Sequence, residues 1–141
     1  MHYTHLPQRA LIAVSGADAN SFLQGLVSND LNKLAPGHAM YAAMLSPQGK
    51  FLHDFFLLRR GESIAIDCDG ARADDLVKRL QLYKLRAQVT LERLEKEGVT
   101  AAWELPSPPQ RGECYADPRL PQLGYRLYGD AAATATWCAA Q

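Results

Sequence analysis

The 141-residue sequence contains little cysteine, no excess of either charge and no long apolar run. Its cysteines are odd in number and far apart, at Cys68, Cys114 and Cys138, and no Cys-x-x-C pair or nearby His at ligand spacing accompanies them. We therefore expect free thiols in a cytoplasmic protein, rather than a disulfide framework or a zinc site. Fifteen Lys and Arg residues balance fifteen Asp and Glu residues, which removes any global electrostatic argument for nucleic-acid or membrane-surface binding.

Several sequence signals of common function classes are also missing. The first residues lack the basic and apolar regions of an export signal, and no apolar run approaches the roughly 20 residues that a membrane span needs. The sequence has no nucleophile elbow, phosphate-binding glycine loop, dinucleotide fingerprint or H-E-x-x-H zinc motif. Function must then rest on polar residues that interrupt an otherwise apolar pattern.

The apolar periodicity predicts an α+β fold with a mostly antiparallel sheet and helices packed on it. The predicted order is β-α-β-β-β-α-β, with strands at 10–14, 40–45, 50–59, 63–68 and 88–94, a helix from Asp18 to about Asn29, and a longer one from 69 or 70 that ends with residues 83–86. A charged turn at 95–98 divides the chain into a unit of residues 1–95 and the start of a second, incomplete unit at 98–141.

The first helix and the strands that follow it contain the most informative polar residues. The strand at 40–45 is apolar on both sides, which predicts a position inside a sheet covered on both faces. Asp54 shares a strand face with Phe56 and Leu58, where an ionised carboxylate is costly unless it is paired or hydrogen-bonded. Two interpretations stay open: an ion pair or solvent-exposed strand end, or a carboxylate in an apolar cavity that binds a planar, nitrogen-rich ligand.

Other polar residues also have both a structural and a functional interpretation. Asn29 and Asp30 follow a helix, where they suit a C-terminal turn. His53 points to the strand face opposite Asp54, which favours a structural role. Five basic residues against one acid between Lys78 and Arg93 indicate either a solvated face or a local anion site.

Three segments in a fixed order carry a family resemblance. They are VSGADANSFLQGLVSNDLNKL, then G-x-x-x-Y-A-A-M-L-S-P-Q-G-K-F, then YKLRAQVTL, and ADPRLPQLGYRLY at 116–128 adds to them. With them, residues 8–94 resemble the YgfZ-type folate-binding proteins, relatives of the aminomethyltransferase (T-protein) of the glycine cleavage system. The resemblance implies a T-protein-like fold that makes residues 1–95 a folate-binding unit. It also implies a role in making or maintaining iron-sulfur enzymes, including one that modifies tRNA.

Two departures from the family pattern refine the expected function. The family's K-G-C-[FY]-x-G-Q-E motif is absent and no cysteine has its context, so the chain corresponds to about the first half of a family member. Aminomethyltransferases have an acidic pair where this sequence has His53 and Asp54, so only one carboxylate carries over. We therefore favour folate binding over catalysis and expect no catalytic residue, with aminomethyl transfer and an RNA or protein interaction module as alternatives.

The resemblance and the chemistry of a folate together give a set of candidate ligand contacts. Asp54 suits the donor nitrogens of a pterin, Tyr41, Met44 or Tyr83 suits the aminobenzoyl ring, and Arg86 or Lys84 suits the glutamate tail. Asn29 and Asp30 are weaker candidates. The expected cofactor is tetrahydrofolate or a derivative, and the expected partners are folate and iron-sulfur client proteins, with no metal, membrane or direct nucleic-acid contact.

Overall fold

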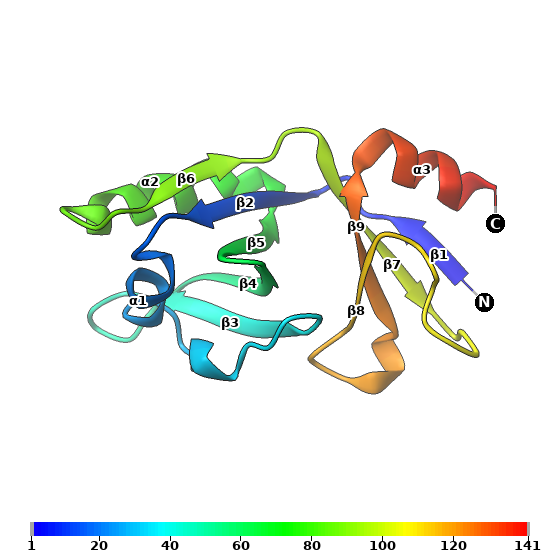
Figure 1. Ribbon diagram of the computed structural model, residues 1–141, viewed down its shortest axis with the longest axis horizontal. Helices are drawn as coiled ribbons and strands as arrows, with labels where there is room; N and C mark the ends of the chain where they lie inside the picture. The colour runs from blue at the N-terminus through cyan, green and yellow to red at the C-terminus, as the bar shows by residue number, and fades with distance from the viewer. Residues whose placement is uncertain (1, 141) are drawn as a thin grey trace.

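Two antiparallel sheets lie side by side in the computed structural model, which describes residues 2–140 (Figure 1). The first sheet has the order β3-β4-β5-β2-β6, formed by β2 (Arg9–Ser15), β3 (Ala39–Leu45), β4 (Phe51–Arg60), β5 (Ser63–Asp69) and β6 (Thr90–Arg93). The second has the order β1-β7-β9-β8, formed by β1 (His2–His5), β7 (Glu97–Trp103), β8 (Glu113–Ala116) and β9 (Tyr125–Asp130). The predicted α+β class is confirmed.

Two helices cover one face of the first sheet. α1 (Ala19–Gln24) and α2 (Ala73–Lys84) bury apolar side chains such as Leu23, Leu76 and Leu80 against the strands. Short 3-10 helices precede β3, α2 and β9: η1 (Leu31–Lys33), η2 (Gly70–Arg72) and η3 (Pro121–Leu123). The opposite face makes its apolar contacts with the second sheet around Leu11, Leu58 and Ala65.

The first helix ends earlier than the sequence predicts. The prediction placed its end near Asn29, but α1 ends at Gln24. Beyond it the chain runs along the edge of β3, where Val27 bridges to Met44 and the Ser28 amide donates to the Ala43 carbonyl at 2.8 Å. Pairing with the sheet edge satisfies these backbone groups and replaces a further helical turn.

The expectation that the strand at 40–45 is covered on both faces is wrong. β3 is the edge strand of its sheet, and Tyr41 and Leu45 are 39% and 42% exposed while Met40 and Met44 are buried. Its apolar residues therefore alternate between the helix-covered face and an open face. The open face begins where the second sheet no longer covers the first (Figure 1).

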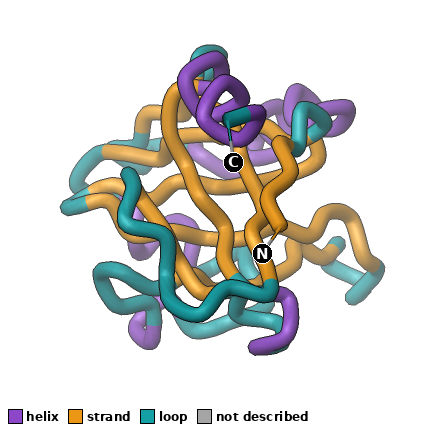
Figure 2. Tube along the Cα trace, turned by 90° about the vertical axis from the view of Figure 1, so that its right-hand side faces the viewer, coloured by secondary structure: helices purple, strands orange, loops and turns teal. Residues whose placement is uncertain are grey.

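The predicted division of the chain at 95–98 covers the end of the β6–β7 connection and the first two residues of β7. The chain's first strand, however, joins the second sheet, because β1 pairs with β7 from His2 opposite Trp103 to His5 opposite Thr100. The last helix, α3 (Ala131–Ala139), lies beside β1 over β7 at the same end of the molecule (Figures 1 and 2). Among residues 2–140, no helix is long and apolar enough to cross a membrane.

A buried carboxylate joins the two sheets. Asp67 on β5 is fully buried and accepts hydrogen bonds from Arg9 Nε at 2.7 Å, Arg126 Nη2 at 2.6 Å and the Tyr128 hydroxyl at 2.8 Å. Arg9 belongs to the first sheet, and Arg126 and Tyr128 belong to β9 of the second. A buried charge is tolerated when its hydrogen bonds and charge are satisfied in this way, so the network fixes how the sheets meet.

We predict that Asp67→Ala strongly destabilises the fold. The substitution leaves Arg126 buried without its carboxylate, a change that typically costs about 3–5 kcal/mol. Urea denaturation followed by far-ultraviolet circular dichroism measures the free energy of unfolding. The control is Asp74→Ala, which removes an 89% exposed carboxylate paired with Arg93 and is expected to leave the midpoint almost unchanged. Equal midpoints for the two variants would contradict the prediction.

Candidate functional site

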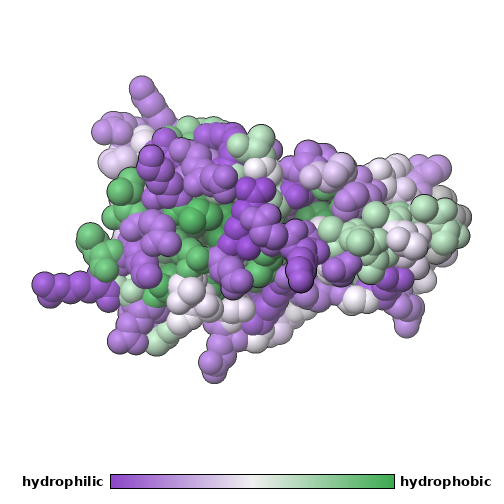
Figure 3. All heavy atoms as spheres, turned by 90° about the horizontal axis from the view of Figure 1, so that it is seen from above, coloured by the Kyte–Doolittle hydropathy of each residue, from purple (hydrophilic) through white to green (hydrophobic). Residues whose placement is uncertain are grey.

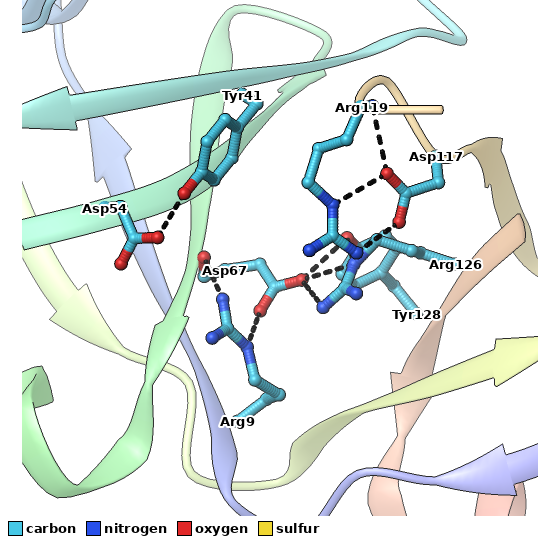
Figure 4. A network of polar contacts seen from close by, with 8 residues as sticks. All are labelled: Arg9, Tyr41, Asp54, Asp67, Asp117, Arg119, Arg126 and Tyr128. Carbon is cyan, nitrogen blue, oxygen red and sulfur yellow. Dashed lines mark hydrogen bonds and ion pairs between the residues drawn. The ribbon is translucent and has the colours of Figure 1, made fainter. Parts of the chain in front are cut away.

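A tyrosine and a carboxylate meet on the open face of the first sheet. In the β3–β4 register, Tyr41 lies opposite Phe56 and Ala43 lies opposite Asp54, so these side chains share the face turned away from α1 and α2. The Tyr41 hydroxyl donates a hydrogen bond to Asp54 Oδ2 (Figure 4). Both residues are solvent-exposed, which makes the pair accessible to a ligand.

An aromatic ring and three guanidinium groups border this pair. The Phe56 ring centre lies 5.2 Å from that of Tyr41, and the guanidinium carbons of Arg126, Arg119 and Arg9 lie 4.1, 4.9 and 5.8 Å from it. Guanidinium groups at such distances are attracted to the π-face of the ring. They come from β9, from the loop after β8 and from β2, so both sheets contribute to one surface (Figure 4).

The carboxylates around the surface keep the arginines charged and oriented. Burial would lower the pKa of the Arg126 guanidinium, but the charge of Asp67 and the hydrogen bonds of Asp67 and Tyr128 raise it above its usual value. At Asp117 burial acts in the other direction and raises the pKa of the carboxyl group. Two hydrogen bonds from the Arg119 side chain outweigh this effect, so the net pKa of Asp117 is lowered. The surface therefore holds fixed donors beside the exposed Asp54 acceptor.

This arrangement suits binding better than covalent chemistry. Asp54 presents a carboxylate that can accept two N–H groups from a planar ring, and Tyr41 offers an aromatic face. Within residues 2–140, no group of three or more His, Cys, Asp or Glu residues is placed to hold a metal ion.

The structure brings only some of the sequence-predicted site residues together. Tyr41 and Asp54 are in contact, and Asn29 is tied to them because its Nδ2 donates to the Tyr41 carbonyl at 3.1 Å. Asp30 caps η1 by accepting from the Asn32 amide at 3.0 Å. Asp30 therefore has a local structural role next to the site.

Tyr83, the other aromatic candidate, lies elsewhere with Arg86. Tyr83 is on the last turn of α2 and lines a groove with Met44 on the helix-covered side, and the exposed Arg86 follows the helix. Asp54 is separated from the end of α2 because side chains alternate between the two faces of β4. His53 is buried toward α2, where its Nε2 lies 2.7 Å from Asp75 Oδ2, so Asp54 points to the opposite face. The end of α2 and the Tyr41–Asp54 pair therefore belong to different surfaces.

The site residues chosen from the sequence did not include Arg9, Asp67, Arg119 or Arg126, and Phe56 was placed beside Asp54 without a role at the site. One signal was present: in the segment SIAIDC, Asp67 alternates with Ile64, Ile66 and Cys68, which marks an acid on the second face of a central strand. The arginines gave no local signal, because they converge on Phe56 only after the two sheets dock.

We predict that Asp54→Asn lowers the pKa of Tyr41. The hydrogen bond to the Asp54 carboxylate, together with partial burial and the negative charge of that group, raises the pKa of the phenol above its usual value. Asn keeps an acceptor but removes the charge, so the phenolate forms at lower pH. Ultraviolet titration of phenolate absorbance measures the shift, and Tyr41→Phe identifies the transition. An unchanged or higher Tyr41 pKa in the Asn variant would rule out this coupling.

Comparison with known proteins connects the chain to a described family. Residues 7–103 match the family described as the GCVT N-terminal domain. A relative from Pyricularia oryzae, described as an iron-sulfur cluster assembly factor IBA57 homolog, mitochondrial, is 37% identical over 94% of this chain and 37% of its own length. The mouse iron-sulfur cluster assembly factor IBA57, mitochondrial, is 34% identical over 86% of this chain and 41% of its own.

A solved structure has the same fold. The glycine cleavage system aminomethyltransferase T from Bartonella henselae superimposes with a TM-score of 0.65 at 23% identity, over 71% of this chain and 28% of that one. The chain thus spans well under half the length of these proteins, in a region that includes the Tyr41–Asp54 pair. Because the family match covers more than half of the sequence, the chain belongs to the GCVT N-terminal domain family.

Proposed function

We propose that this protein binds a folate and serves as an iron-sulfur cluster assembly factor. The exposed Tyr41–Asp54 pair on the open sheet face is the observation on which the proposal rests. The names of the similar proteins from Pyricularia oryzae and mouse support the assembly role. Tetrahydrofolate or a derivative is the proposed ligand, and iron-sulfur proteins, among them a tRNA-modifying enzyme, are the proposed clients.

The proposed binding mode assigns the pterin to the Tyr41–Asp54 pair. The ring's N–H groups donate to Asp54, and its plane packs against the exposed side of Tyr41. Asn29 holds the backbone of Tyr41, and Asp30 fixes the adjoining turn. Phe56 and its arginines keep the surface rigid, since each arginine is also held by a carboxylate.

The sequence-based candidates for the outer part of the ligand remain a separate proposal. Tyr83 and Arg86 lie at the end of α2, on a different surface from Asp54. Arg86 is exposed and is not part of any ion pair within residues 2–140. If it binds the glutamate tail, Arg86→Ala must weaken the binding of a folate with several glutamates more than that of a folate with one.

We predict that Asp54→Asn weakens tetrahydrofolate binding about tenfold or more, the usual loss when a hydrogen bond to a charged group is removed. Isothermal titration calorimetry on the protein expressed from its whole reading frame measures the dissociation constant. Asp74→Asn, which neutralises an exposed carboxylate on α2, is the matched control. Equal affinities of the two variants would overturn the role of Asp54, and no binding by the unmodified protein would overturn the ligand.

Binding is favoured over aminomethyl transfer because Asp54 is the only carboxylate at positions 53 and 54, where the aminomethyltransferases have an acidic pair. His53 is 3% exposed and is bonded to Asp75 on the other face, so it is not available beside Asp54. The transferase alternative requires folate-dependent turnover that Asp54→Asn abolishes. Unchanged turnover in that variant would exclude this carboxylate as essential.

The nucleic-acid alternative rests on the basic residues between Lys78 and Arg93, and some of these are paired with acids. Arg79 is paired with Asp75, and Arg93 is paired with Asp74 and lies 3.8 Å from Glu95, which leaves only part of the basic segment uncompensated. RNA binding through this basic segment would weaken steeply with salt.

The free thiols Cys68, Cys114 and Cys138 support the proposed location in a reducing compartment such as the cytoplasm.

The assembly role predicts a cellular phenotype that depends on the same carboxylate. In cells that lack the protein, the activity of iron-sulfur enzymes, including the tRNA-modifying one, should fall, and the unmodified gene should restore it. Asp54→Asn should restore less than Asp74→Asn at equal protein level, because only the former loses the ligand. Full restoration by Asp54→Asn would separate the assembly role from the proposed folate site.

A further inference from the structure

An open apolar groove lies where the β3–β4 hairpin meets the end of α2 and the segment after α1. It has a volume of about 320 Å³. Its lining includes the apolar residues Leu26, Val27, Met44, Leu45, Pro47 and Tyr83. Tyr41 and Asp54 do not line it, so it is separate from the proposed pterin site.

Large apolar side chains extend from this groove into solvent. Leu45 is 42% exposed, Tyr83 44%, and Phe51, which pairs with Leu45 across the hairpin, 59%. Leu85, two residues beyond Tyr83, is 88% exposed. Figure 3 shows strongly hydrophobic residues at the surface mainly over the half of the molecule that carries α2 and β6. Clusters of exposed apolar residues of this kind mark interaction surfaces.

The backbone at Leu85 holds its side chain outward at an energetic cost. Leu85 has φ 44° and ψ −111°, a conformation that favours glycine and that a residue with a side chain rarely adopts. The side chain gains almost no burial in return. Strained positions of this type cluster at sites that bind other molecules.

The charged residues adjoining these apolar positions are cationic. Lys50 belongs to the hairpin turn next to Phe51, and Lys84 and Arg86 flank Leu85. None of the three takes part in an ion pair within the described part of the chain. Within residues 2–140, the acids Asp18 and Asp30 form no ion pair with these three residues and accept hydrogen bonds from the Gln88 and Asn32 amides.

We propose that this groove docks an acidic amphipathic helix of a partner protein. Apolar side chains on one face of the helix enter the groove and cover Leu85, and Asp or Glu residues on its flanks face Lys50, Lys84 and Arg86. The positive rim disfavours a second copy of this chain, which would bring like charges together across a twofold interface. The groove lies apart from the Tyr41–Asp54 pair, so a docked partner leaves the proposed pterin site open.

The test uses a synthetic fluorescent peptide with Leu at helical positions i, i+3, i+4 and i+7 and Glu on both flanks, titrated with the protein while anisotropy is recorded. A matched peptide with Lys in place of Glu is the charge control. The Glu peptide should bind at low salt and more weakly at physiological salt. Leu45→Ser and the double variant Lys84→Glu/Arg86→Glu should each weaken it about tenfold, as expected for a central anchor and its complementary charges.

Two further variants separate docking from structure. Leu120→Ser changes a 56% exposed leucine beside η3 and should leave peptide binding unchanged. Leu85→Gly should weaken binding and raise the urea midpoint, because glycine relieves the backbone strain. If Leu85 had only a structural role, Leu85→Gly would not weaken peptide binding while it raises the urea midpoint. Folate affinity should be the same in Leu45→Ser as in the unmodified protein.

Three results would overturn the proposal. One is equal binding of the Glu and Lys peptides. Another is equal binding of the Glu peptide by Leu45→Ser and Leu120→Ser. The third is self-association, seen by sedimentation, that Leu85→Gly abolishes, which would assign the groove to a second copy of the chain.

Discussion

The hydrogen bonds and charge pairing of one buried carboxylate determine how the two sheets of this molecule pack together. Asp67 lies on a central strand of the first sheet with no exposed surface, and its acceptor atoms are bonded by Arg9, Arg126 and Tyr128. Each donor comes from a strand distant in sequence, so the network forms only when the two sheets dock in one orientation. Because a misplaced docking would leave charges buried and unpaired, the network makes the arrangement specific.

That docking leaves part of the first sheet uncovered. The second sheet packs near Leu11, Leu58 and Ala65, whereas Tyr41 and Asp54 further along the strands remain exposed. The arginines that bind Asp67 and Asp117 also surround Phe56, so the boundary of the open face is built from the same groups that join the sheets. The proposed ligand surface is therefore a consequence of how the sheets meet.

The two proposed binding surfaces use different parts of the β3–β4 hairpin. Tyr41 and Asp54 face away from α1 and α2, while Met44 and Tyr83 meet at a groove beside the helices. The alternation of side chains along a strand allows one hairpin to serve both. This separates the Asp54 carboxylate, suited to nitrogen donors, from a cationic rim suited to acidic partners.

The sequence by itself determined what local patterns encode. Apolar periodicity identified the five strands of the first sheet and the second helix, and the ordered motifs identified the family, since these signals depend on neighbouring residues. It also singled out Tyr41 and Asp54, whose contact follows from hairpin pairing over a short loop. These predictions needed no information about distant parts of the chain.

Only the tertiary structure decided which faces are covered and which distant residues meet. The edge position of β3, the entry of residues 2–5 into the second sheet and the early end of α1 depend on strand neighbours that apolar pattern does not specify. Arg9, Arg119 and Arg126 reach one ring from separate segments, and the separation of Arg86 from Asp54 follows from the layer in which α2 packs. Local sequence does not specify these strand neighbours and contacts. They are set by pairing between distant segments, so only the folded chain shows them.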